Sequence, residues 1–213
     1  HSDEVLLQVV HEDAHLLVLH KPSGLLTIPG QSPTQQDCLI TRARQRWPDA
    51  LIVHRLDQAT SGLLILARGP AMQKTLSMAF EKRLVHKRYE AVVQGLPTGQ
   101  PEPDGWSEIS LPIRIDWQNR PRSIVDPVRG KPSLTRWQAL GEGPWPDTTR
   151  LALEPLTGRT HQLRLHPMAL GHPIVGDPLY APPPWPCLAP RLLLHACGLQ
   201  LVHPATGQAL ALS

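Results

Sequence analysis

Short apolar runs, each bounded by turn residues, recur along the whole chain and limit the folds that it can adopt. Such runs are typical of β-strands, and runs that follow one another closely are typical of hairpins. The pattern predicts strands at residues 5–10, 15–20, 51–56, 63–68, 87–94, 108–115, 134–140, 151–156, 192–202 and 209–212. Helical patterns are fewer and cover residues 37–47, 70–83 and the stretch after Thr157 through Leu170. More strands than helices, linked mainly as hairpins, favour an α+β fold with a mixed, mostly antiparallel sheet and flanking helices.

The length and the prolines indicate how the chain is divided. A chain of 213 residues with 41% hydrophobic residues suits a single domain built of two closely packed halves. The Pro/Gly-rich segment 96–107 is the predicted connector between the halves. Asp37 and Pro70 are expected to begin the first two helices, and Pro167 is expected to kink or shorten the third, because its ring removes a backbone donor.

Several functional classes lack the sequence features that they need. No apolar run approaches the ~20 residues of a membrane-spanning helix, and the polar residues 1–4 show no sign of a signal peptide. The three cysteines lack motif spacing, which indicates a reducing compartment, and we expect a cytoplasmic protein. The histidine spacing matches no metal motif, and no glycine-rich phosphate loop occurs. We therefore expect no membrane partner, no metal and no small-molecule cofactor.

Positive charge is gathered into three segments, although the formal net charge is only +3. The cations lie within residues 42–46, 82–88 and 114–136. Three basic segments can merge into one surface that follows the phosphates of RNA. Each segment alone is better explained as a solvated face, so only their combination favours a nucleic-acid partner.

The segment His54–Gly62 places an acidic side chain between two predicted strands. Asp57 lies in this polar segment, which ends in the turn Thr60-Ser61-Gly62. A carboxylate held at the end of a strand can act as a nucleophile or a general base. The alternative is an Asx-turn, in which the carboxylate accepts the N–H groups near Thr60 and Ser61; for this segment alone that alternative is favoured.

The segment Thr157–His166 supplies a possible partner for that carboxylate. Gly158 indicates a tight turn from strand to helix, which places Arg159 at the helix start. A cation is unfavourable there unless it has an anionic partner, and Asp57 is a candidate that close pairing would keep ionised. A surface arginine near a helix cap is the alternative.

A tyrosine on a predicted strand is the third feature. Tyr89 lies in Lys87-Arg88-Tyr89-Glu90-Ala91, and Phe and Tyr residues are rare in the chain. A tyrosine that faces inward from a strand usually belongs to the core. Beside a basic segment it can instead stack on a nucleobase.

Together these segments resemble the RluA family of RNA pseudouridine synthases. The resemblance rests on Lys-Pro-Ser-Gly at 21–24, His-Arg-Leu-Asp-x-x-Thr-Ser-Gly at 54–62, Lys-x-Tyr-x-Ala at 87–91 and Gly-Arg-Thr-His-Gln-Leu-Arg at 158–164. It extends to Leu-Gly-His-Pro-Ile-Val-Gly-Asp at 170–177 and Arg-Leu-Leu-Leu-His-Ala at 191–196. Six segments in the same order cover nearly the whole chain. They leave no room for an S4-type RNA-binding domain, and residues 115–121 resemble the subgroup named for RluA itself.

The resemblance implies the pseudouridine synthase fold, with a central basic cleft, and isomerisation of uridine in an RNA stem-loop. By matched position, Asp57 is the expected nucleophile, Arg159 its partner, and Tyr89 the residue that stacks on uracil and acts as base at C5. Arg55 is expected to fill the space of the extruded base, and Leu163 to line the pocket. The other expected substrate-binding residues are His54, Thr60, Lys87 and Arg164.

The RNA target and two other functions stay open at this point. The resembling subgroup modifies large-subunit ribosomal RNA and the tRNA anticodon stem-loop, and the 126–133 loop and the 181–190 segment are places where RNA choice can differ. The attack can be on C1′ of the sugar or on C6 of uracil. One alternative function is a catalytically silent RNA-binding or RNA-folding protein, and another is a hydrolytic glycosylase. A monomer is the default oligomeric state.

Overall fold

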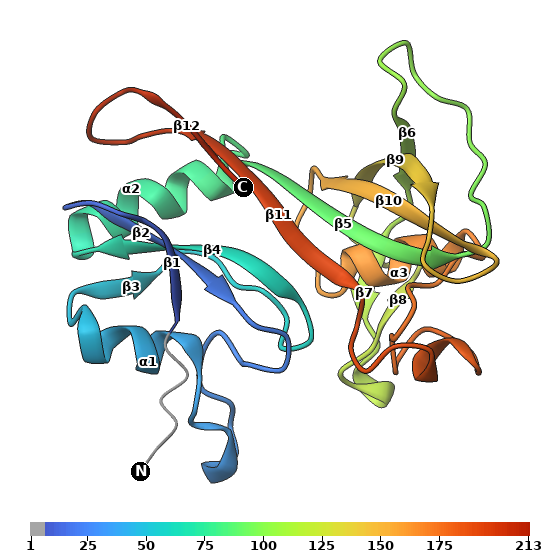
Figure 1. Ribbon diagram of the computed structural model, residues 1–213, viewed down its shortest axis with the longest axis horizontal. Coiled ribbons are helices and arrows are strands. Elements are labelled where there is room, and N and C mark those ends of the chain that lie inside the picture. The colour runs from blue at the N-terminus through green and yellow to red at the C-terminus, as the bar shows by residue number, and fades with distance from the viewer. Residues whose placement is uncertain (1–6) are drawn as a thin grey trace. The chain divides into compact units, whose positions relative to one another are not determined.

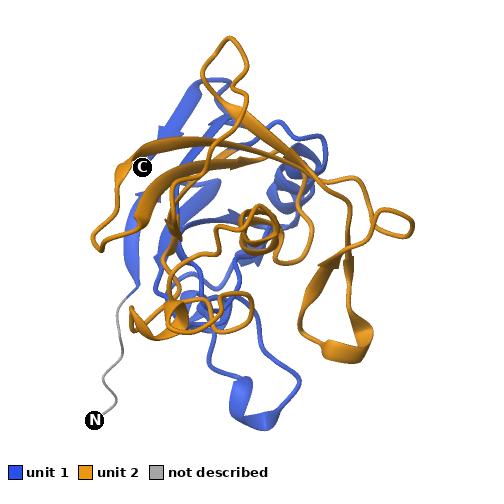
Figure 2. Ribbon diagram, turned by 90° about the vertical axis from the view of Figure 1, so that its right-hand side faces the viewer, with its two compact units in different colours: residues 1–86, 196–213 blue, residues 87–195 orange. Residues whose placement is uncertain are grey.

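A computed structural model describes residues 7–213, which divide into two compact units. Of these residues, unit 1 holds 7–86 and 196–213, and unit 2 holds 87–195 (Figure 2). The expected connector, 96–107, lies inside unit 2, where it leads from one strand to the next. The unit boundaries fall at residues 86/87 and 195/196, close to the ends of two long strands rather than in a loop. Residues 5 and 6 of the first predicted strand lie outside the described residues.

Unit 1 is built on strands that pair antiparallel. These are β1 (Gln8–Glu12), β2 (Leu16–Lys21), β3 (Ala50–Ile52), β4 (Ser61–Arg68), β11 (Leu194–Val202) and β12 (Ala209–Leu212). Strand β2 pairs with β1 and β4, β3 pairs with β4, and β12 pairs with β11. Residues of β2 and β4 are buried on both faces of the sheet, which explains why their sequences are continuous apolar runs rather than alternating ones.

Two α-helices pack against the sheet of unit 1 (Figure 1). Helix α1 (Leu39–Arg46) contacts β3, and α2 (Pro70–Glu81) contacts β3 and β4. Pro70 occupies the first turn of α2, where its missing N–H costs nothing, as predicted. Leu76 is fully buried, and Met72, Ala79 and Phe80 on the same face of the helix pack against the same cluster. Sequence periodicity therefore placed this helix correctly.

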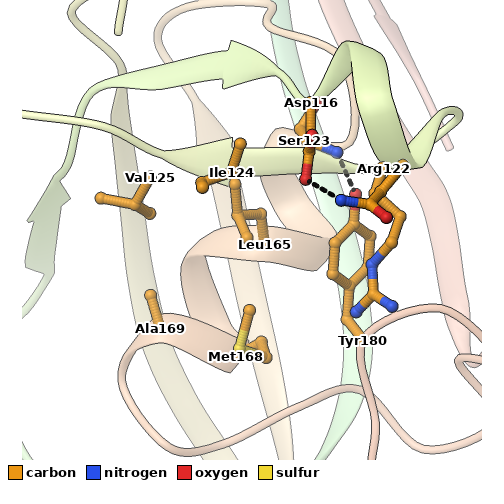
Figure 3. A pocket seen from close by; sticks show the side chains of 10 residues that line it. Asp116, Arg122, Ser123, Ile124, Val125, Leu165, Met168, Ala169 and Tyr180 are labelled. Carbon is orange, nitrogen blue, oxygen red and sulfur yellow. Dashed lines mark hydrogen bonds between the residues drawn. The ribbon is translucent and has the colours of Figure 1, made fainter. Parts of the chain in front are cut away.

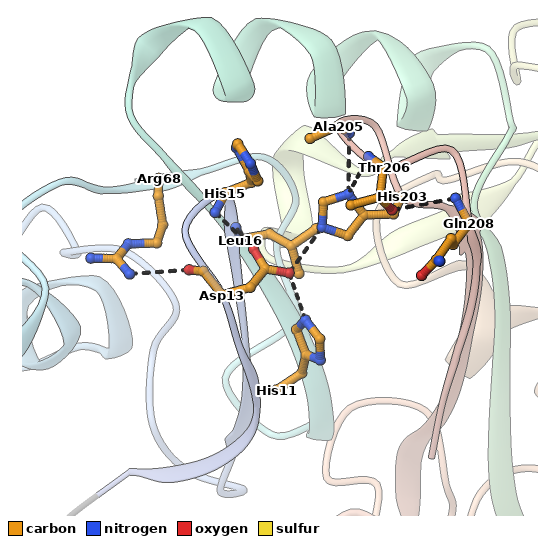
Figure 4. A network of polar contacts seen from close by, with 9 residues as sticks. All are labelled: His11, Asp13, His15, Leu16, Arg68, His203, Ala205, Thr206 and Gln208. Atoms are coloured by element: carbon orange, nitrogen blue, oxygen red, sulfur yellow. Dashed lines mark hydrogen bonds and ion pairs between the residues drawn. The ribbon is translucent and has the colours of Figure 1, made fainter.

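A polar network joins two turns of unit 1 that lie far apart in the sequence (Figure 4). One carboxylate oxygen of Asp13, in the β1–β2 turn, lies 2.8 Å from His11 Nε2 and 2.9 Å from His203 Nε2. The Nδ1 of His203 accepts the backbone N–H groups of Ala205 and Thr206, so Nε2 carries the proton and donates to Asp13. Burial alone would raise the pKa of Asp13, but these bonds and those from backbone N–H groups lower it well below its usual range.

Unit 2 has a four-stranded antiparallel sheet and a separate hairpin. The sheet runs β5 (His86–Gln94), β10 (Thr148–Pro155), β9 (Leu134–Glu142), β6 (Ser107–Ser110), and the hairpin pairs β7 (Ile113–Ile115) with β8 (Ser123–Val125). Helix α3 (Gln162–Ala169) contacts β8, β9 and β10. Short 3-10 helices span Pro33–Gln35 in unit 1 and Trp117–Asn119 and Trp185–Cys187 in unit 2. Three α-helices within residues 7–213 and these sheets make an α+β fold, as predicted.

Some predicted boundaries were wrong, and each has a local cause. The strand 51–56 ends at Ile52, because the His54 ring, rather than a backbone carbonyl, accepts the N–H of Ile65 at 2.9 Å. The strand 108–115 is broken into β6 and β7 beside Pro112, which has no N–H for the ladder. Asp37 does not cap α1; its carboxylate instead accepts two bonds from Arg42, at 2.8 and 2.7 Å.

The third helix differs most from its prediction. It begins at Gln162, so Arg159 lies in a loop three residues earlier and not at the helix start. Pro167 lies inside the helix, which is only eight residues long and ends at Ala169. The helix therefore continues for two residues beyond Pro167, and its short length comes from its later start rather than from the proline. Strand β8, a short Ser-Ile-Val segment between loops, was not predicted at all.

Candidate active site

Asp57 lies in the loop between β3 and β4, with its side chain half-buried. The turn is closed by the backbone carbonyl of Asp57, which accepts the N–H of Thr60 at 3.0 Å. An Asx-turn requires the carboxylate to accept a backbone N–H. Among residues 7–213 the Asp57 carboxylate accepts no hydrogen bond. Thr60 is 2% exposed and anchors the turn. The chain thus holds the backbone of Asp57 and leaves its carboxylate available for chemistry.

A buried lysine holds this turn from beneath. Lys21, at the end of β2, is 0% exposed, and its Nζ donates to the carbonyls of Pro22 (3.0 Å), Leu25 (2.6 Å) and Gln58 (3.0 Å). A buried ammonium is unfavourable without such partners, and three carbonyls match its three N–H groups. Since Gln58 follows Asp57 directly, Lys21 ties the loop after β2 to the Asp57 turn.

Further bonds join the same two loops. The N–H of Gly24 donates to the Gln58 carbonyl at 2.7 Å, and Ser23 Oγ donates to the carbonyl of Ala59 at 2.7 Å. The sequence predicted no role for Lys21, although residues 21–24 belong to the segments that resemble the family. A lysine at the end of a strand that begins with four apolar residues was the available signal, because a buried charge must find internal partners.

The other predicted residues of unit 1 divide into two kinds. The ring of His54 stacks on Phe80, with centroids 4.3 Å apart, while its Nε2 accepts the N–H of Ile65. These contacts hold the loop against α2 and β4, so they give His54 a structural role. Arg55 is exposed and its side chain faces solvent.

In unit 2, β5 carries Tyr89 and Lys87. Tyr89 is 9% exposed and lies on the buried side of the strand with Ala91 and Val93, as the alternation predicted. Lys87 is half-buried, and burial lowers its pKa. Its Nζ lies 4.0 Å from the place that a Cβ on Gly158 would occupy. Unit 2 therefore brings the start of β5 together with the loop of Arg159.

The Arg159 loop is fixed by the side-chain amide of Gln162. The Oε1 of Gln162 accepts from Thr157 Oγ1 at 2.6 Å and from the N–H of Arg159 at 3.1 Å. Its Nε2 donates to the carbonyl of Leu134 at 3.0 Å and to Thr135 Oγ1 at 2.9 Å. The amide is 3% exposed and uses all of its hydrogen-bonding capacity. The sequence did not predict this role, because two of the partners of Gln162 lie on β9, far away in the sequence.

The guanidinium of Arg159 is only partly engaged. Its Nε and one terminal nitrogen donate to the carbonyl of Pro132, at 3.2 and 3.0 Å. A guanidinium has five N–H donors, so three of them stay available to an anion. Leu163, the second residue of α3, is 8% exposed.

Arg164, a predicted substrate-binding residue, is buried and paired with a carboxylate. It is 4% exposed and forms two bonds to the fully buried Asp177, at 2.9 and 2.6 Å. Because both groups are removed from water, each needs the other. These contacts place Arg164 in the interior of unit 2, and its contact with RNA stays a prediction.

Comparisons with known proteins decide the family. The family model described as RNA pseudouridylate synthase matches residues 15–169. The chain belongs to this family. The RNA pseudouridylate synthases with similar sequences include the dual-specificity RNA pseudouridine synthase RluA of Pasteurella multocida, 44% identical over 97% of this chain and 92% of that protein. The protein of the same name from Escherichia coli strain K12 is 42% identical over 97% of this chain and 92% of its own length.

Solved structures of RNA pseudouridylate synthases share the fold. Human RNA pseudouridylate synthase domain containing 1 aligns with a TM-score of 0.78 and 30% identity, covering 99% of this chain and 83% of that one. Human RNA pseudouridylate synthase domain containing 4 gives a TM-score of 0.71 and 25% identity, over 96% of this chain and 87% of that one. The predicted family and fold are thus confirmed. The match of the family model includes Asp57, Tyr89 and Arg159.

Part of the positive charge of this synthase is neutralised by ion pairs. Arg42 pairs with Asp37, Arg114 with Asp126, and Arg136 with Asp104 and Glu154. Counting cations along the sequence therefore overstated the charge that the basic segments can offer to RNA. The basic cleft stays a prediction.

Among residues 7–213, this synthase has neither a helix suited to span a membrane nor a cluster of metal ligands. None of its helices there is both long and apolar enough to cross a membrane. The same residues bring no three His, Cys, Asp or Glu side chains into a group that could hold a metal ion.

Proposed function

We propose that this protein isomerises specific uridines of structured RNA to pseudouridine, with Asp57 as the nucleophile. The observation that carries the proposal is the state of Asp57: its backbone is fixed by Thr60 and its carboxylate is free of internal hydrogen bonds among residues 7–213. A nucleophile needs a backbone that is held in place and a side chain that its own loop does not use, so that the carboxylate can meet the substrate.

The reaction rearranges atoms within one nucleotide. The N1–C1′ bond of uridine breaks, the uracil turns, and C5 bonds to C1′ while the C5 proton leaves and N1 gains one. Substrate and product have the same composition, so the reaction consumes no oxidant, reductant or second substrate. A carboxylate serves this reaction by attacking either C1′ or C6.

The remaining residues are proposed to hold the nucleotide and the charge. The free N–H groups of Arg159 suit the Asp57 carboxylate, and a close cation keeps a carboxyl group ionised. Tyr89 is proposed to stack on the uracil, a contact worth about 1–3 kcal/mol, and to act as the base at C5. Such stacking offsets the few kcal/mol that extrusion of a base costs.

The other proposed contacts follow the family pattern and the exposure of each side chain. Arg55 is exposed and suits the space of the extruded base, whereas Leu163 offers an apolar wall. Lys87, with its pKa lowered by burial, is proposed to meet an RNA phosphate together with the Gly158 backbone.

We further propose stem-loops of large-subunit ribosomal RNA and of the tRNA anticodon as substrates. The support is the likeness to RNA pseudouridine synthases named as dual-specificity enzymes over 97% of this chain. The protein is proposed to act as a monomer in the cytoplasm, where both RNAs are found.

The test is release of tritium from RNA labelled at C5 of uridine. Wild-type protein is expected to release tritium and to form pseudouridine. Asp57→Asn is expected to lower the rate by about a thousandfold or more. Asp37→Asn, which changes an exposed carboxylate of the same unit, is the matched control and should keep the wild-type rate.

Each other outcome identifies a different function. Normal turnover by Asp57→Asn would overturn the proposed mechanism. Binding of the stem-loop without any tritium release by wild-type protein would identify a silent RNA-binding protein. Free uracil and an abasic RNA product would identify a glycosylase.

A further inference from the structure

The residue that leads from the Arg159 loop into α3 has a strained backbone. His161 has φ 57 and ψ 22, in the left-handed region that residues other than glycine rarely occupy. A strained residue of this kind persists only where its surroundings hold it in place. The contacts of His161 therefore show what fixes the course of the loop.

The hydroxyl of Tyr180 is one of these contacts. It lies 2.7 Å from His161 Nδ1 and accepts the backbone N–H of Ser123, on strand β8, at 2.8 Å. Tyr180 is 5% exposed, and burial raises its pKa, so the hydroxyl keeps its proton at neutral pH. The hydroxyl therefore has one donor and one further acceptor site for the bond with His161 Nδ1, and the tautomer of His161 sets the direction of that bond.

Tyr180 is itself firmly held. The carboxylate of Asp177, paired with the buried Arg164, accepts the backbone N–H of Tyr180 at 3.3 Å and that of Leu179 at 2.9 Å. The guanidinium groups of Arg122 and Arg164 each lie 5.4 Å from the centre of the Tyr180 ring. Figure 3 shows Tyr180 beside Arg122, with its hydroxyl against the backbone of Ser123.

A second bond joins the same strand to the same loop. Ser123 Oγ donates to the carbonyl of Thr160 at 2.8 Å, so β8 reaches both Thr160 and, through Tyr180, His161. The hairpin β7–β8 forms one wall of a surface depression of about 500 Å³, and α3 forms the other. Its lining includes Tyr180, Arg122, Met168 and Leu165 (Figure 3). Tyr180 thus connects this hairpin with the segment that carries Arg159.

We propose that Tyr180 is a positioning residue for the isomerisation, acting through His161 on Arg159. Its hydroxyl holds the left-handed turn from one side, while the Gln162 amide holds Thr157 and Arg159 from the other. The loop then presents the guanidinium of Arg159 in one direction. This inference rests on the proposed function, because Tyr180 matters only if Arg159 has the role that is proposed for it there.

The test compares Tyr180→Phe, which removes only the hydroxyl, with the wild-type protein. Single-turnover tritium release at saturating RNA is expected to fall by about tenfold to a hundredfold, because small misplacements of a reacting group cost that much. The KM for RNA is expected to change by less than about twofold, since no RNA contact is lost. Thr148→Val is the matched control: it removes another buried hydroxyl of unit 2, at the start of β10, and should keep the rate.

Two further measurements separate positioning from folding. In the background of His161→Gly, which relieves the left-handed strain and removes the imidazole, Tyr180→Phe should lower the rate by less than about threefold. The backbone N–H of Gln162 donates to the Arg159 carbonyl at 3.1 Å. Without RNA, Tyr180→Phe should speed the hydrogen exchange of this backbone N–H.

The outcomes are distinguishable from failure of the proposed function. If wild-type protein makes no pseudouridine, the proposed function fails, and the inference about Tyr180 fails with it. If wild-type protein is active but Tyr180→Phe keeps its rate, or if its effect is fully additive with that of His161→Gly, the positioning role is wrong. Faster exchange at Gln162 with an unchanged rate would likewise reduce Tyr180 to a purely structural residue.

Discussion

Replacing Lys21 by methionine tests how the Asp57 turn is held. Methionine keeps most of the apolar length of the side chain and removes the ammonium. The carbonyls of Pro22, Leu25 and Gln58 then lose the bond from the ammonium, and the Gln58 carbonyl keeps only the N–H of Gly24. Because Lys21 is 0% exposed, water cannot replace the lost bonds without opening the loop.

The magnitude follows from two opposing effects. Three hydrogen bonds from a charged donor, at about 1.5–3 kcal/mol each, would together stabilise the fold by roughly 4–9 kcal/mol. Against this, methionine spares the several kcal/mol needed to bury an ammonium. We expect a net loss of about 3 kcal/mol in the free energy of unfolding, which for a chain of this size lowers Tm by about 6–12 °C.

Urea unfolding and hydrogen exchange measure the two parts of this expectation. Lys74→Met, an exposed lysine of α2, is the matched control and should change stability by less than about 0.5 kcal/mol. In Lys21→Met the amide protons of Gly24 and Thr60, which bond to the Gln58 and Asp57 carbonyls, should exchange faster than in the control. Tritium release should fall as well, because the backbone of Asp57 is no longer fixed.

The reasoning would be refuted by one clear result. If Lys21→Met unfolds at the same urea concentration as Lys74→Met and keeps slow exchange at Gly24 and Thr60, the ammonium does not hold the turn. A loss of stability without faster exchange at these two amides would place the effect elsewhere in unit 1.

Two further changes test the packing and the buried charge. Gly62 has φ +126, and an added Cβ would overlap the backbone of β11. Gly62→Ala should therefore lower the free energy of unfolding, measured in urea, by about 3 kcal/mol or more. Gly69→Ala is the control, because Gly69 also has a positive φ (+89) but lies in open space, and it should lower stability clearly less. Burial, opposed by a bond to the Leu111 carbonyl, lowers the pKa of His166 from 6.5. As the pH falls, His166 therefore binds a proton more readily in the unfolded chain than in the folded one. The free energy of unfolding should fall by up to about 1.4 kcal/mol from pH 7.5 to 5.5. His166→Gln should remove this pH dependence.

Elements with a regular pattern could be predicted from the sequence. Helix α2 was placed from its first proline and its apolar face, and β4 from a run that is buried on both sides of the sheet. The β11–β12 hairpin followed from two apolar runs around the turn 204–207. In these elements local preference and burial agree, so the sequence alone contains enough information.

Elements that depend on distant partners could not be predicted. Strand β3 ends where the His54 ring takes the place of a backbone acceptor, and no local pattern announces this. Strand β8 has only three residues, and the backbone N–H of its Ser123 is bonded to the hydroxyl of Tyr180, far away in the sequence. The start of α3 depends on the amide of Gln162, whose partners lie on β9.

The candidate site shows the same division. Asp57, Tyr89 and Arg159 were predicted from motifs in a fixed order; all three lie within the residues that the family model matches, and their roles stay a prediction. Arg164 belongs to the same motif, yet its bonds to Asp177 place it inside unit 2. A motif therefore gives the residues that a site needs without separating those that react from those that hold the backbone.

The contacts in each unit allow that separation on physical grounds. In unit 1 the buried ammonium of Lys21 binds the carbonyl beside Asp57, and in unit 2 the buried amide of Gln162 binds the N–H of Arg159. In both cases a neighbouring polar group fixes the backbone of a residue that is proposed to react. Changes of Asp57, whose carboxylate accepts no hydrogen bond within residues 7–213, should then affect chemistry with little effect on folding. Changes of Arg159 should in addition remove its two bonds to the Pro132 carbonyl. Changes of Lys21 or Gln162 should affect both chemistry and folding, because the loop that carries the reactive group depends on them.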